Sequence, residues 1–252
     1  MSNTGVAALV WVLMAGASGA SVPTAAADTT YAAVLADPAR KDDRDDDARR
    51  KPAELLALAK VKPGDKVVDL IPGGGYFSRL FSRAVGPKGH VYALWPNEYA
   101  AEAHPAPEHQ TAAYKKAPWT NISVVLQPAK AFATPEPVDL VFTSQNYHDY
   151  PDKFMGPTDP AVLNRAVFKA LKPGGYYVII DHSAPKGSGL KDTETLHRID
   201  VETVKAEVKA AGFVLDGESQ ALRNPKDPLT IKVFDPKIRG RTDQFALRFR
   251  KP

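Results

Sequence analysis

Cysteine is absent from this chain of 252 residues. Its absence excludes disulfide bonds, a thiolate nucleophile and metal sites with cysteine ligands, and it leaves the redox compartment open. A long basic block is also missing, since 33 basic and 29 acidic side chains give a net charge of only +4. Without such a block to neutralise a row of phosphates, nucleic acid is not an expected partner. The 44% of hydrophobic residues suffices for the core of one large α/β domain.

Charged side chains are missing from the first 27 residues as well. Within them, Val6–Ala17 is a continuous apolar run, short for a bilayer span, and the segment ends in three alanines at 25–27. This pattern favours a signal peptide over 1–27 and a periplasmic or secreted mature protein. Because the segment lacks the usual Lys or Arg before the apolar run, an uncleaved anchor and a misassigned start codon are the alternatives. Beyond export we expect no stable membrane partner, and the sequence indicates no oligomeric state.

Residues 28–51 form a charged lead-in to the main domain, which we place at 52–252. Within the lead-in, the run Arg40–Lys51 packs eleven charged residues around one alanine. Such a run is typical of a solvated helix face or loop. Pro52 can open the helix that follows, because the first helical position needs no amide donor.

Short apolar strands alternate with helices from residue 66 onward. We expect strands at 66–70, 90–94, 122–126, 138–143, 176–181, 213–222 and 243–250, and helices at 52–60, 76–85, 98–104, 160–171 and 200–211. The pattern predicts an α/β fold with a Rossmann-like, doubly wound, mostly parallel seven-stranded sheet and a terminal antiparallel strand. Residues 223–241, rich in proline and charge, form an excursion between the last two strands. In such a sheet, ligands bind at the carboxyl ends of the strands, near the reversal of strand order.

The strongest local motif is the turn that follows the first strand. This strand carries Asp69 near its end, and the chain then runs through Gly73, Gly74 and Gly75 into a helix that begins at Tyr76. Glycines allow unusual backbone angles and leave no Cβ in the way of a ligand, while the first amides of a helix attract anionic or strongly polar groups. The position of the glycines between a strand and a helix predicts a ligand-binding turn.

A second set of polar residues, Asn146-Tyr-His-Asp149, follows the fourth strand and faces the predicted crevice. His148 can act as a general base because its ordinary pKa is about 6.5, and Asp149 can orient it. The alternative is that both side chains only cap the next turn.

Further polar groups lie at Asp181-His182, which ends the fifth strand, and at His197-Arg198, which precedes the following helix. Together with His148 they are candidates for a metal site, but histidines that do not share a helix are weak evidence for one, and we expect no metal. The other three histidines, at positions 90, 104 and 109, are expected on edges or loops.

Three motifs, in this order, resemble those of class I S-adenosylmethionine-dependent methyltransferases. They are KPGDKVVDLIPGGG at 62–75, GPKGHVYA at 86–93 and LKPGGYYVIID at 171–181. The resemblance covers roughly residues 50 to 250. The glycine turn, the segment 146–149 and the segment 195–200 also resemble a group of exported bacterial proteins described as predicted methyltransferases.

This resemblance implies S-adenosylmethionine as the cofactor and a small molecule as the methyl acceptor. Asp69 and Gly73, Gly74 and Gly75 would hold the methionine portion and the ribose side of the cofactor. The rest of the implied cofactor-binding set is Tyr76, Trp95, Glu98 and Asn146. His148 and Asp149 are the implied catalytic pair.

Three positions depart from the family pattern. Ile71 stands where the first glycine of the motif is usual, and Trp95 lies near the place of the acid that normally ends the second strand and binds the ribose. Glu98 can take over that role. The acid often found after the third strand, near the adenine, is missing around Gln127.

Two other functions stay open. A non-catalytic binding or sensing protein on the same fold is favoured by the missing ribose acid and by export, since S-adenosylmethionine is made in the cytosol. A metal-dependent hydrolase that uses the histidine and aspartate residues is the other alternative. Fold alone does not decide among them, because this architecture hosts many chemistries.

Overall fold

The computed structural model describes residue 1, residues 31–103 and residues 107–252. The signal peptide predicted over 1–27, apart from Met1, and His104 therefore lie outside the described residues. None of the described helices combines the length and the apolar character that crossing a bilayer requires.

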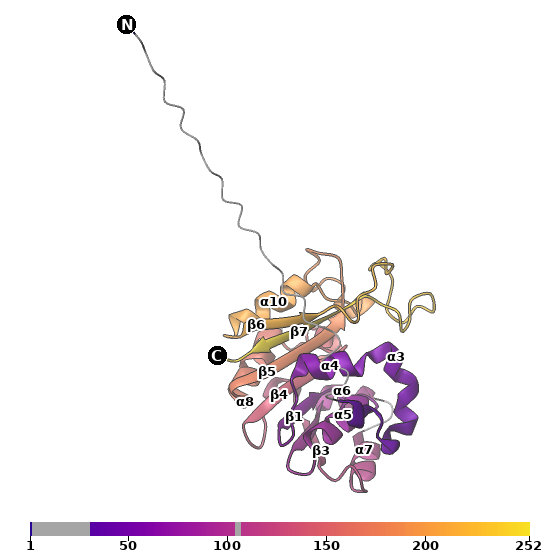
Figure 1. Cartoon of the computed structure of the whole chain (residues 1–252). Coiled ribbons are helices and arrows are strands. Elements are labelled where there is room, and N and C mark those ends of the chain that lie inside the picture. The colour runs from indigo at the N-terminus through magenta and orange to yellow at the C-terminus, as the bar shows by residue number, and fades with distance from the viewer. Residues whose placement is uncertain (2–30, 104–106) are drawn as a thin grey trace.

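Seven strands form one sheet in the order β3-β2-β1-β4-β5-β7-β6 (Figure 1). The strands are β1 (Lys66–Leu70), β2 (His90–Pro96), β3 (Ile122–Gln127), β4 (Val138–Ser144), β5 (Leu171–His182), β6 (Val214–Ser219) and β7 (Gln244–Arg250). Strands β1 to β5 pair in parallel, and β7 runs antiparallel to both of its neighbours, β5 and β6. The predicted Rossmann-like fold is confirmed. The order of the strands reverses between β1 and β4, where ligands bind in sheets of this kind.

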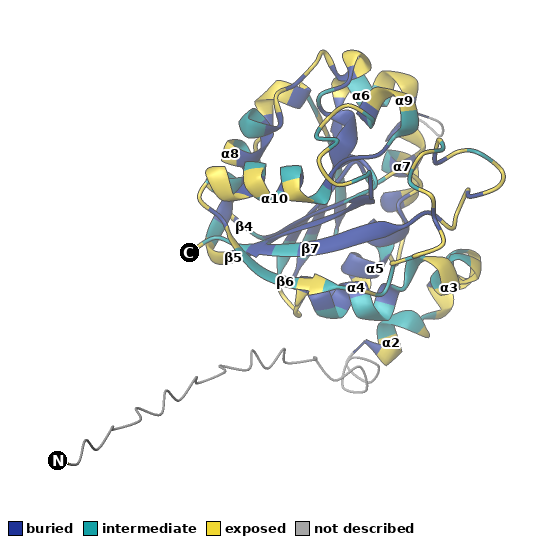
Figure 2. Ribbon diagram, turned by 90° about the horizontal axis from the view of Figure 1, so that it is seen from above, coloured by how far each residue is buried: buried dark blue, intermediate teal, exposed yellow. Residues whose placement is uncertain are grey.

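Helices cover both faces of the sheet. Their bounds are α2 (Ala32–Leu35), η2 (Pro38–Asp46), α3 (Asp47–Arg50), α4 (Pro52–Ala59), α5 (Tyr76–Val85), α6 (Asn97–Glu102), α7 (Pro107–Tyr114), η3 (Ala129–Ala131), η4 (Tyr147–Asp149), η5 (Lys153–Met155), α8 (Pro160–Ala170), α9 (Thr193–Leu196) and α10 (Val201–Ala210). Seen from above, α8 and α10 lie on one side of the buried strands, and α4 and α5 on the other (Figure 2).

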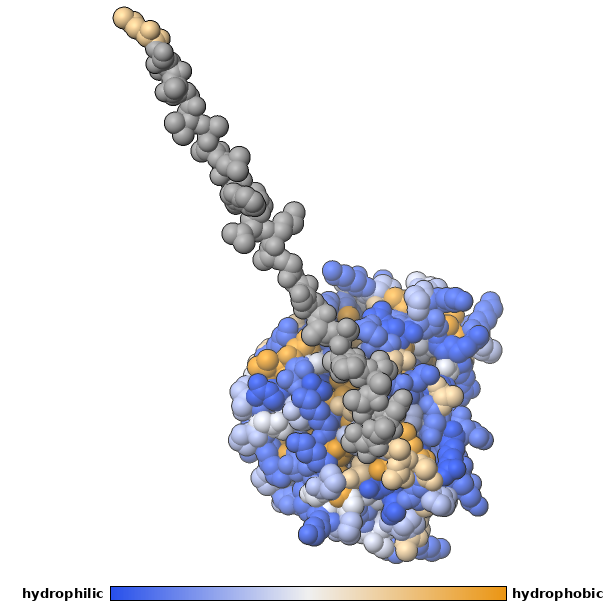
Figure 3. Space-filling model, viewed as in Figure 1, coloured by the Kyte–Doolittle hydropathy of each residue, from blue (hydrophilic) through white to orange (hydrophobic). Residues whose placement is uncertain are grey.

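Two apolar clusters form the core, one on each face of the sheet. Successive side chains of a strand point to opposite faces, so Val68 of β1 joins the cluster beneath α8 and α10, whereas its neighbour Val67 joins the cluster beneath α4 and α5. Helix α4 begins at Pro52, as predicted, since the missing amide of proline costs nothing at that position. On the face shown in Figure 3, hydrophilic residues dominate and apolar ones are scattered.

Several elements differ from those expected, among them β2, β5, α7 and β6, which covers only Val214–Ser219 of the strand expected at 213–222. Strand β2 continues to Pro96, so Trp95 is part of the strand. Strand β5 begins at Leu171 instead of at the expected Tyr176, so residues 172–175 lie in the strand beside a bulge. Helix α7 was not predicted because it buries only Pro107, Gln110 and Tyr114 and shows no apolar stripe. His109 lies on this helix, so its expected place on an edge or loop is wrong.

The predicted excursion between β6 and β7 is confirmed, since residues 223–241 contain neither helix nor strand. A buried ion pair anchors it to the domain, in which Arg198 donates to both carboxylate oxygens of Asp227, at 2.9 and 3.1 Å. Both side chains are fully buried. The excursion therefore has a defined path, and it brings Val233 and Phe234 to the carboxyl end of the sheet.

The charged lead-in packs against the domain over its described part. Arg40 is fully buried, with Nη2 at 2.7 Å from the carboxylate of Asp47 and Nη1 at 3.0 Å from the carbonyl oxygen of Leu35. The solvated face expected for this run is therefore wrong for Arg40, although Lys41, Asp42 and Asp45 are exposed.

Candidate functional site

A crevice of about 690 Å³ opens at the carboxyl ends of β1, β2, β4 and β5, where the strand order reverses. Its walls come from the turn after β1, from the ends of β2 and β4, from η4, and from the lead-in and the excursion. The sheet thus brings together polar groups that are far apart in the sequence.

The glycine turn forms one wall of the crevice. Gly73 and Gly74 line it, and a Cβ added to either would meet no atom within 4 Å. Gly73 has a left-handed backbone (φ +55°), whereas Gly74 does not. Gly75 is different, because it does not line the crevice and a Cβ there would collide with the hydroxyl of Tyr114. Two of the three predicted glycines therefore leave space for a ligand, and the third makes room for a side chain.

Asp69 lies beneath this turn and is 2% exposed. Its carboxylate accepts a hydrogen bond of 2.6 Å from the hydroxyl of Ser78, and burial raises the pKa of Asp69 to about 6 despite that bond. A buried carboxyl group with a raised pKa at the edge of a crevice is typical of a ligand-binding group.

Asn146 ties the end of β4 to the glycine turn. Its Nδ2 donates to the carbonyl oxygens of Ile71, at 3.1 Å, and of Ser144, at 2.6 Å, while its Oδ1 accepts from the hydroxyl of Tyr99 at 3.2 Å. Ile71 occupies the usual glycine position with a left-handed backbone (φ +56°), which is strained for a β-branched residue. Asn146 therefore holds the strained carbonyl in place.

The end of β2 contributes Trp95, which is buried and lines the crevice. Its Nε1 donates to Oε1 of Gln110 at 3.3 Å, and Nε2 of Gln110 in turn donates to the carbonyl oxygen of Gly73. Gln110, on the unpredicted helix α7, thus connects β2 to the glycine turn. The sequence gives no local signal for this role.

Glu98 does not line the crevice. Its Oε2 accepts a hydrogen bond of 2.8 Å from the backbone N–H of Ala129, so the expectation that it reaches the ribose does not fit this geometry. Glu102, at the end of α6, does line the crevice.

The lead-in closes another side of the crevice with Asp43, Asp46 and Arg50. Asp43 forms an ion pair with Arg79 of α5. The predicted site residue Tyr76 lines the same wall and donates its hydroxyl to Asp47 at 2.5 Å; burial and the Asp47 carboxylate raise the pKa of Tyr76. Reasoning from the sequence missed this wall because the charged run resembles a solvated segment.

His148, Asp149 and His197, which we call the histidine cluster, also line the crevice. Nε2 of His148 is 3.2 Å from Oδ1 of Asp149 and 3.3 Å from Nδ1 of His197. Nδ1 of His148 is 2.7 Å from Oδ1 of the fully buried Asp181, whose other oxygen accepts the backbone N–H of His148 at 2.9 Å. His148 is therefore held by carboxylates on both sides.

These carboxylates set the protonation of His148. Burial alone would lower the pKa of His148, but Asp181 and Asp149 outweigh it and raise the pKa well above its ordinary value. The pKa of Asp149 is lowered, because His148 and His197 overcome the effect of burial. A protonated imidazole has no lone pair to accept a proton, so a simple general-base role for His148 does not follow from this arrangement.

His182 also lines the crevice, with Nδ1 at 2.8 Å from the hydroxyl of Thr242. Burial and the neighbouring cations His148 and Arg198 lower the pKa of His182 to about 4, so this ring is neutral at pH 7.

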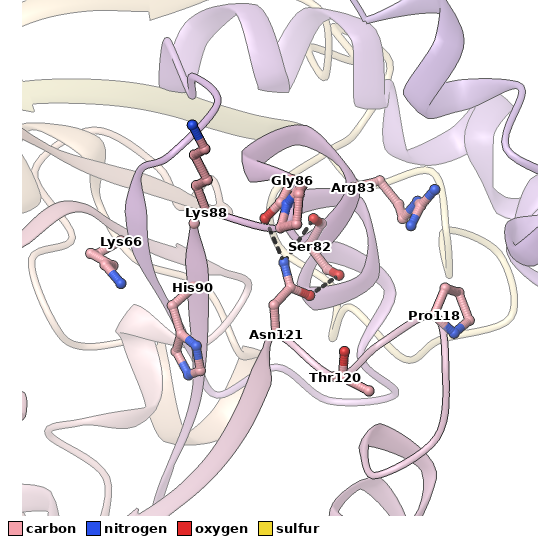
Figure 4. Close-up of a pocket in the computed structure, with 11 residues that line it drawn as sticks. Lys66, Ser82, Arg83, Gly86, Lys88, His90, Pro118, Thr120 and Asn121 are labelled. Carbon is pink, nitrogen blue, oxygen red and sulfur yellow. Dashed lines mark hydrogen bonds between the residues drawn. The ribbon is translucent and has the colours of Figure 1, made fainter.

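A second hollow lies at the amino ends of β1 and β2 (Figure 4). Within it, Nδ2 of Asn121 donates to the carbonyl oxygens of Ser82, at 3.1 Å, and of Gly86, at 3.0 Å. These bonds close the end of helix α5. The hollow contains no group that contributes to the crevice, so we assign it no role in the chemistry.

Comparisons with known proteins place this geometry in context. No protein-family model matches the chain. It is 29% identical over 132 residues to the ubiquinone/menaquinone biosynthesis C-methyltransferase UbiE of Shewanella frigidimarina, a match that covers 52% of this chain and 48% of that protein. It is 28% identical over 187 residues to UbiE of Legionella pneumophila (strain Lens), a match that covers 71% of this chain and 68% of that protein. The chain thus spans about half the length of the first relative.

Solved structures share the fold. A S-adenosylmethionine-dependent methyltransferase from Aquifex aeolicus matches with a TM-score of 0.56 at 19% identity, covering 86% of this chain and 95% of that one. Fibrillarin from Aeropyrum pernix, solved with natively bound S-adenosyl-L-methionine, matches with a TM-score of 0.51 at 16% identity. The match covers 80% of this chain and 75% of fibrillarin. The chain is therefore a relative of S-adenosylmethionine-dependent methyltransferases with the class I fold, and that predicted resemblance is confirmed.

Proposed function

We propose that this protein transfers a methyl group from S-adenosylmethionine to a small-molecule acceptor bound in the crevice. The observation that carries the proposal is that one cavity joins an open glycine turn to a cluster of ionisable side chains. A cofactor and an acceptor need two such neighbouring subsites, because methyl transfer requires the two reactants to be held in line and in contact.

The residues of the turn fit the cofactor. The space beside Gly74 admits a ligand against the backbone, and the buried Asp69 supplies a carboxylate for the ammonium group of the methionine portion. S-adenosylmethionine supplies the electrophilic methyl group on its sulfonium sulfur. Trp95 offers an apolar wall, and Glu102 offers a carboxylate to the ribose hydroxyls in place of Glu98.

The histidine cluster forms the acceptor side of the crevice in this proposal. His148 and Asp149 of the cluster lie on η4, shortly after β4, and the neighbouring His182 ends β5, so the sheet supports this side of the crevice. Rigid support matters because positioning supplies much of the rate of methyl transfer. The roles of these residues are the orientation of the acceptor and the control of its proton.

Calorimetric titration with S-adenosylmethionine and S-adenosylhomocysteine tests the proposal directly. We expect both to bind with one site per chain, and we expect release of S-adenosylhomocysteine when small-molecule acceptors are added with S-adenosylmethionine. His148→Ala should lower turnover and leave the affinity for S-adenosylhomocysteine nearly unchanged, because the turn holds the cofactor. Failure of both cofactor forms to bind the folded protein would refute the proposal.

We further propose that residues 1–27 direct the protein to the periplasm or outside the cell. The support is the uncharged apolar run followed by alanines. A reporter fused after Ala27 should cross the inner membrane, whereas a fusion in which Leu9 and Val12 are replaced by Asp should stay in the cytosol. Cytosolic retention of the unmodified fusion would reject export.

A further inference from the structure

We propose that His148, Asp149 and His197 bind a divalent transition-metal ion, best matched by Zn²⁺, in the acceptor side of the crevice. Among the described residues, these three bring one ligand atom each to within 4.8 Å of one another. They come from two separate segments, η4 and the turn after α9, and the fold alone brings them together. The proposal about binding stands by itself, and only its consequence for catalysis rests on the proposed function.

The distances between the three ligand atoms fit a metal ion. They are 3.2 Å from Nε2 of His148 to Oδ1 of Asp149, 3.3 Å from Nε2 of His148 to Nδ1 of His197, and 3.8 Å from Nδ1 of His197 to Oδ1 of Asp149. Bonds of about 2.0–2.1 Å in a tetrahedron separate neighbouring ligands by about 3.3–3.4 Å. A zinc ion therefore fits among these atoms with small shifts of the side chains.

The carboxylate of Asp181 supports His148 in the way that a carboxylate commonly supports a metal-binding histidine. Oδ1 of Asp181 lies 2.7 Å from Nδ1 of His148, and Oδ2 accepts the backbone N–H of the same residue. When a metal ion displaces the Nε2 proton of His148, the proton that remains on Nδ1 faces Asp181 and the lone pair of Nε2 faces the cluster. A carboxylate that fixes the tautomer and orientation of a ligating histidine in this way is a regular part of zinc sites.

The end of α9 and the ring of Phe234 fix the position of His197. His197 is the C-cap residue of α9, with the left-handed backbone (φ +55°) that commonly ends a helix. Its ring packs against Phe234 with centroids 4.9 Å apart. The imidazole is therefore held beside His148 and Asp149 by packing as well as by the chain.

The ligand types select the metal. Two imidazoles and one carboxylate suit zinc, iron, cobalt or manganese, whereas magnesium and calcium prefer oxygen ligands alone. Three protein ligands leave at least one coordination position open, which is the arrangement of catalytic rather than structural zinc sites. All three ligands line the crevice, so the open position is available to a bound molecule.

Given the proposed function, the metal identifies the acceptor as a small molecule with a phenolic or similarly acidic hydroxyl group. Coordination to the metal lowers the pKa of that hydroxyl, and its proton leaves to water. The oxygen then forms a bond to the methyl carbon while the bond from sulfur to that carbon breaks, and the electron pair of the broken bond stays on sulfur. The metal thus takes over the task that a general base would otherwise perform.

Metal binding is tested without any assay of methyl transfer. The metal-free protein is titrated with Zn²⁺ by calorimetry, with Mg²⁺ as a competitor, and Co²⁺ is used as a visible-light probe of the ligand geometry. We expect one Zn²⁺ per chain, an intense Co²⁺ spectrum of low coordination number, and no competition from Mg²⁺. His197→Ala should weaken Zn²⁺ binding at least 100-fold, and Asp181→Asn about 10–100-fold.

His109→Ala is the matched control, because this exposed histidine lies on α7 outside the cluster and its loss should change nothing. Circular dichroism and the titration with S-adenosylhomocysteine are measured on every variant. Unchanged cofactor binding with lost Zn²⁺ binding supports the site, whereas cofactor binding without any Zn²⁺ binding overturns it and leaves the proposed function standing. Equal Zn²⁺ affinity in the wild type and His197→Ala also overturns the assignment. Should His197→Ala fail to fold, the Co²⁺ spectrum of the wild-type protein decides alone.

Discussion

The three glycines of the turn after β1 differ in what an added side chain would meet. Gly73 and Gly75 both have a left-handed backbone (φ +55° and +78°), and a Cβ at Gly75 would also collide with the hydroxyl of Tyr114. Gly74 alone combines an unstrained φ with open space. Side chains added at Gly74 therefore extend into the crevice, whereas those added at Gly73 also strain the backbone.

We predict that Gly74→Val weakens binding of S-adenosylhomocysteine at least tenfold and lowers stability by less than about 1 kcal/mol, because the side chain fills ligand space without a clash in the free protein. Gly73→Ala serves as the comparison and should cost about 1 kcal/mol through its left-handed backbone. Calorimetry and thermal unfolding measure the two effects. Equal affinity in folded Gly74→Val would remove this turn from the cofactor site.

Asp69 predicts a pH dependence of cofactor binding. Its pKa is about 6, and the ammonium group of the cofactor prefers the ionised carboxylate, so affinity for S-adenosylhomocysteine should rise about tenfold between pH 5 and pH 7. Asp69→Asn should bind weakly at both pH values. A wild-type affinity that does not change over this range would contradict the role of Asp69.

The same shift predicts that Asp69 destabilises the free protein at neutral pH. A folded-state pKa raised from 3.8 to about 6 means that the folded state binds more protons between those values, so stability falls as the pH rises through this window. Asp69→Asn should therefore be more stable than the wild type at pH 7, by up to about 3 kcal/mol, and the difference should shrink toward pH 4. Denaturant unfolding at the two pH values measures it.

Residues at the end of a strand or just after it could be assigned to the crevice from the sequence. Asp69, Gly74, Asn146 and His148 all lie there because the ends of parallel strands meet at one edge of the sheet. Gln110 could not be assigned, since its place depends on how a helix without an apolar stripe packs on the turn.

The lead-in shows how an element can be misjudged from composition. Its charges alternate in sign without an apolar stripe, which is typical of a solvated segment, yet Arg40 is buried beneath it. The Arg40 guanidinium also lies 5.5 Å from the ring centroid of Tyr76, whose hydroxyl binds Asp47. These contacts join individual side chains of the lead-in and of α5, and they follow no helical or strand period, so the sequence pattern does not reveal them. The apolar strands and amphipathic helices were predicted well because burial of one face imposes a period on the sequence.

We predict that Arg40→Ala lowers the free energy of unfolding by about 2–4 kcal/mol, because it empties a buried site and leaves Asp47 without its cation. Arg49→Ala, which breaks an exposed pair with Asp46 on the same segment, should cost less than about 0.5 kcal/mol. Urea unfolding of both variants checks the contrast. Similar small losses would mean that the lead-in contributes little to the folded domain.

The whole molecule is organised around the reversal of strand order between β1 and β4. Four strand ends, the lead-in and the excursion all reach the crevice, so a ligand there contacts elements from both halves of the chain. Such a ligand binds only when these parts are assembled. Its binding free energy therefore adds to the stability of the entire domain rather than to that of one segment.

We predict that S-adenosylhomocysteine at 100 times its Kd stabilises the domain by about 2.7 kcal/mol, which for a chain of this size raises Tm by roughly 5–11 °C. At the same ligand concentration, Gly74→Val with a tenfold weaker affinity should gain only about 1.4 kcal/mol, about half of the wild-type shift. Arg40→Ala should show a lower Tm without ligand. Thermal unfolding with and without ligand measures all three. An equal shift in Gly74→Val and the wild type would mean that the ligand binds away from the glycine turn, and no shift in either would mean that the crevice does not bind the cofactor.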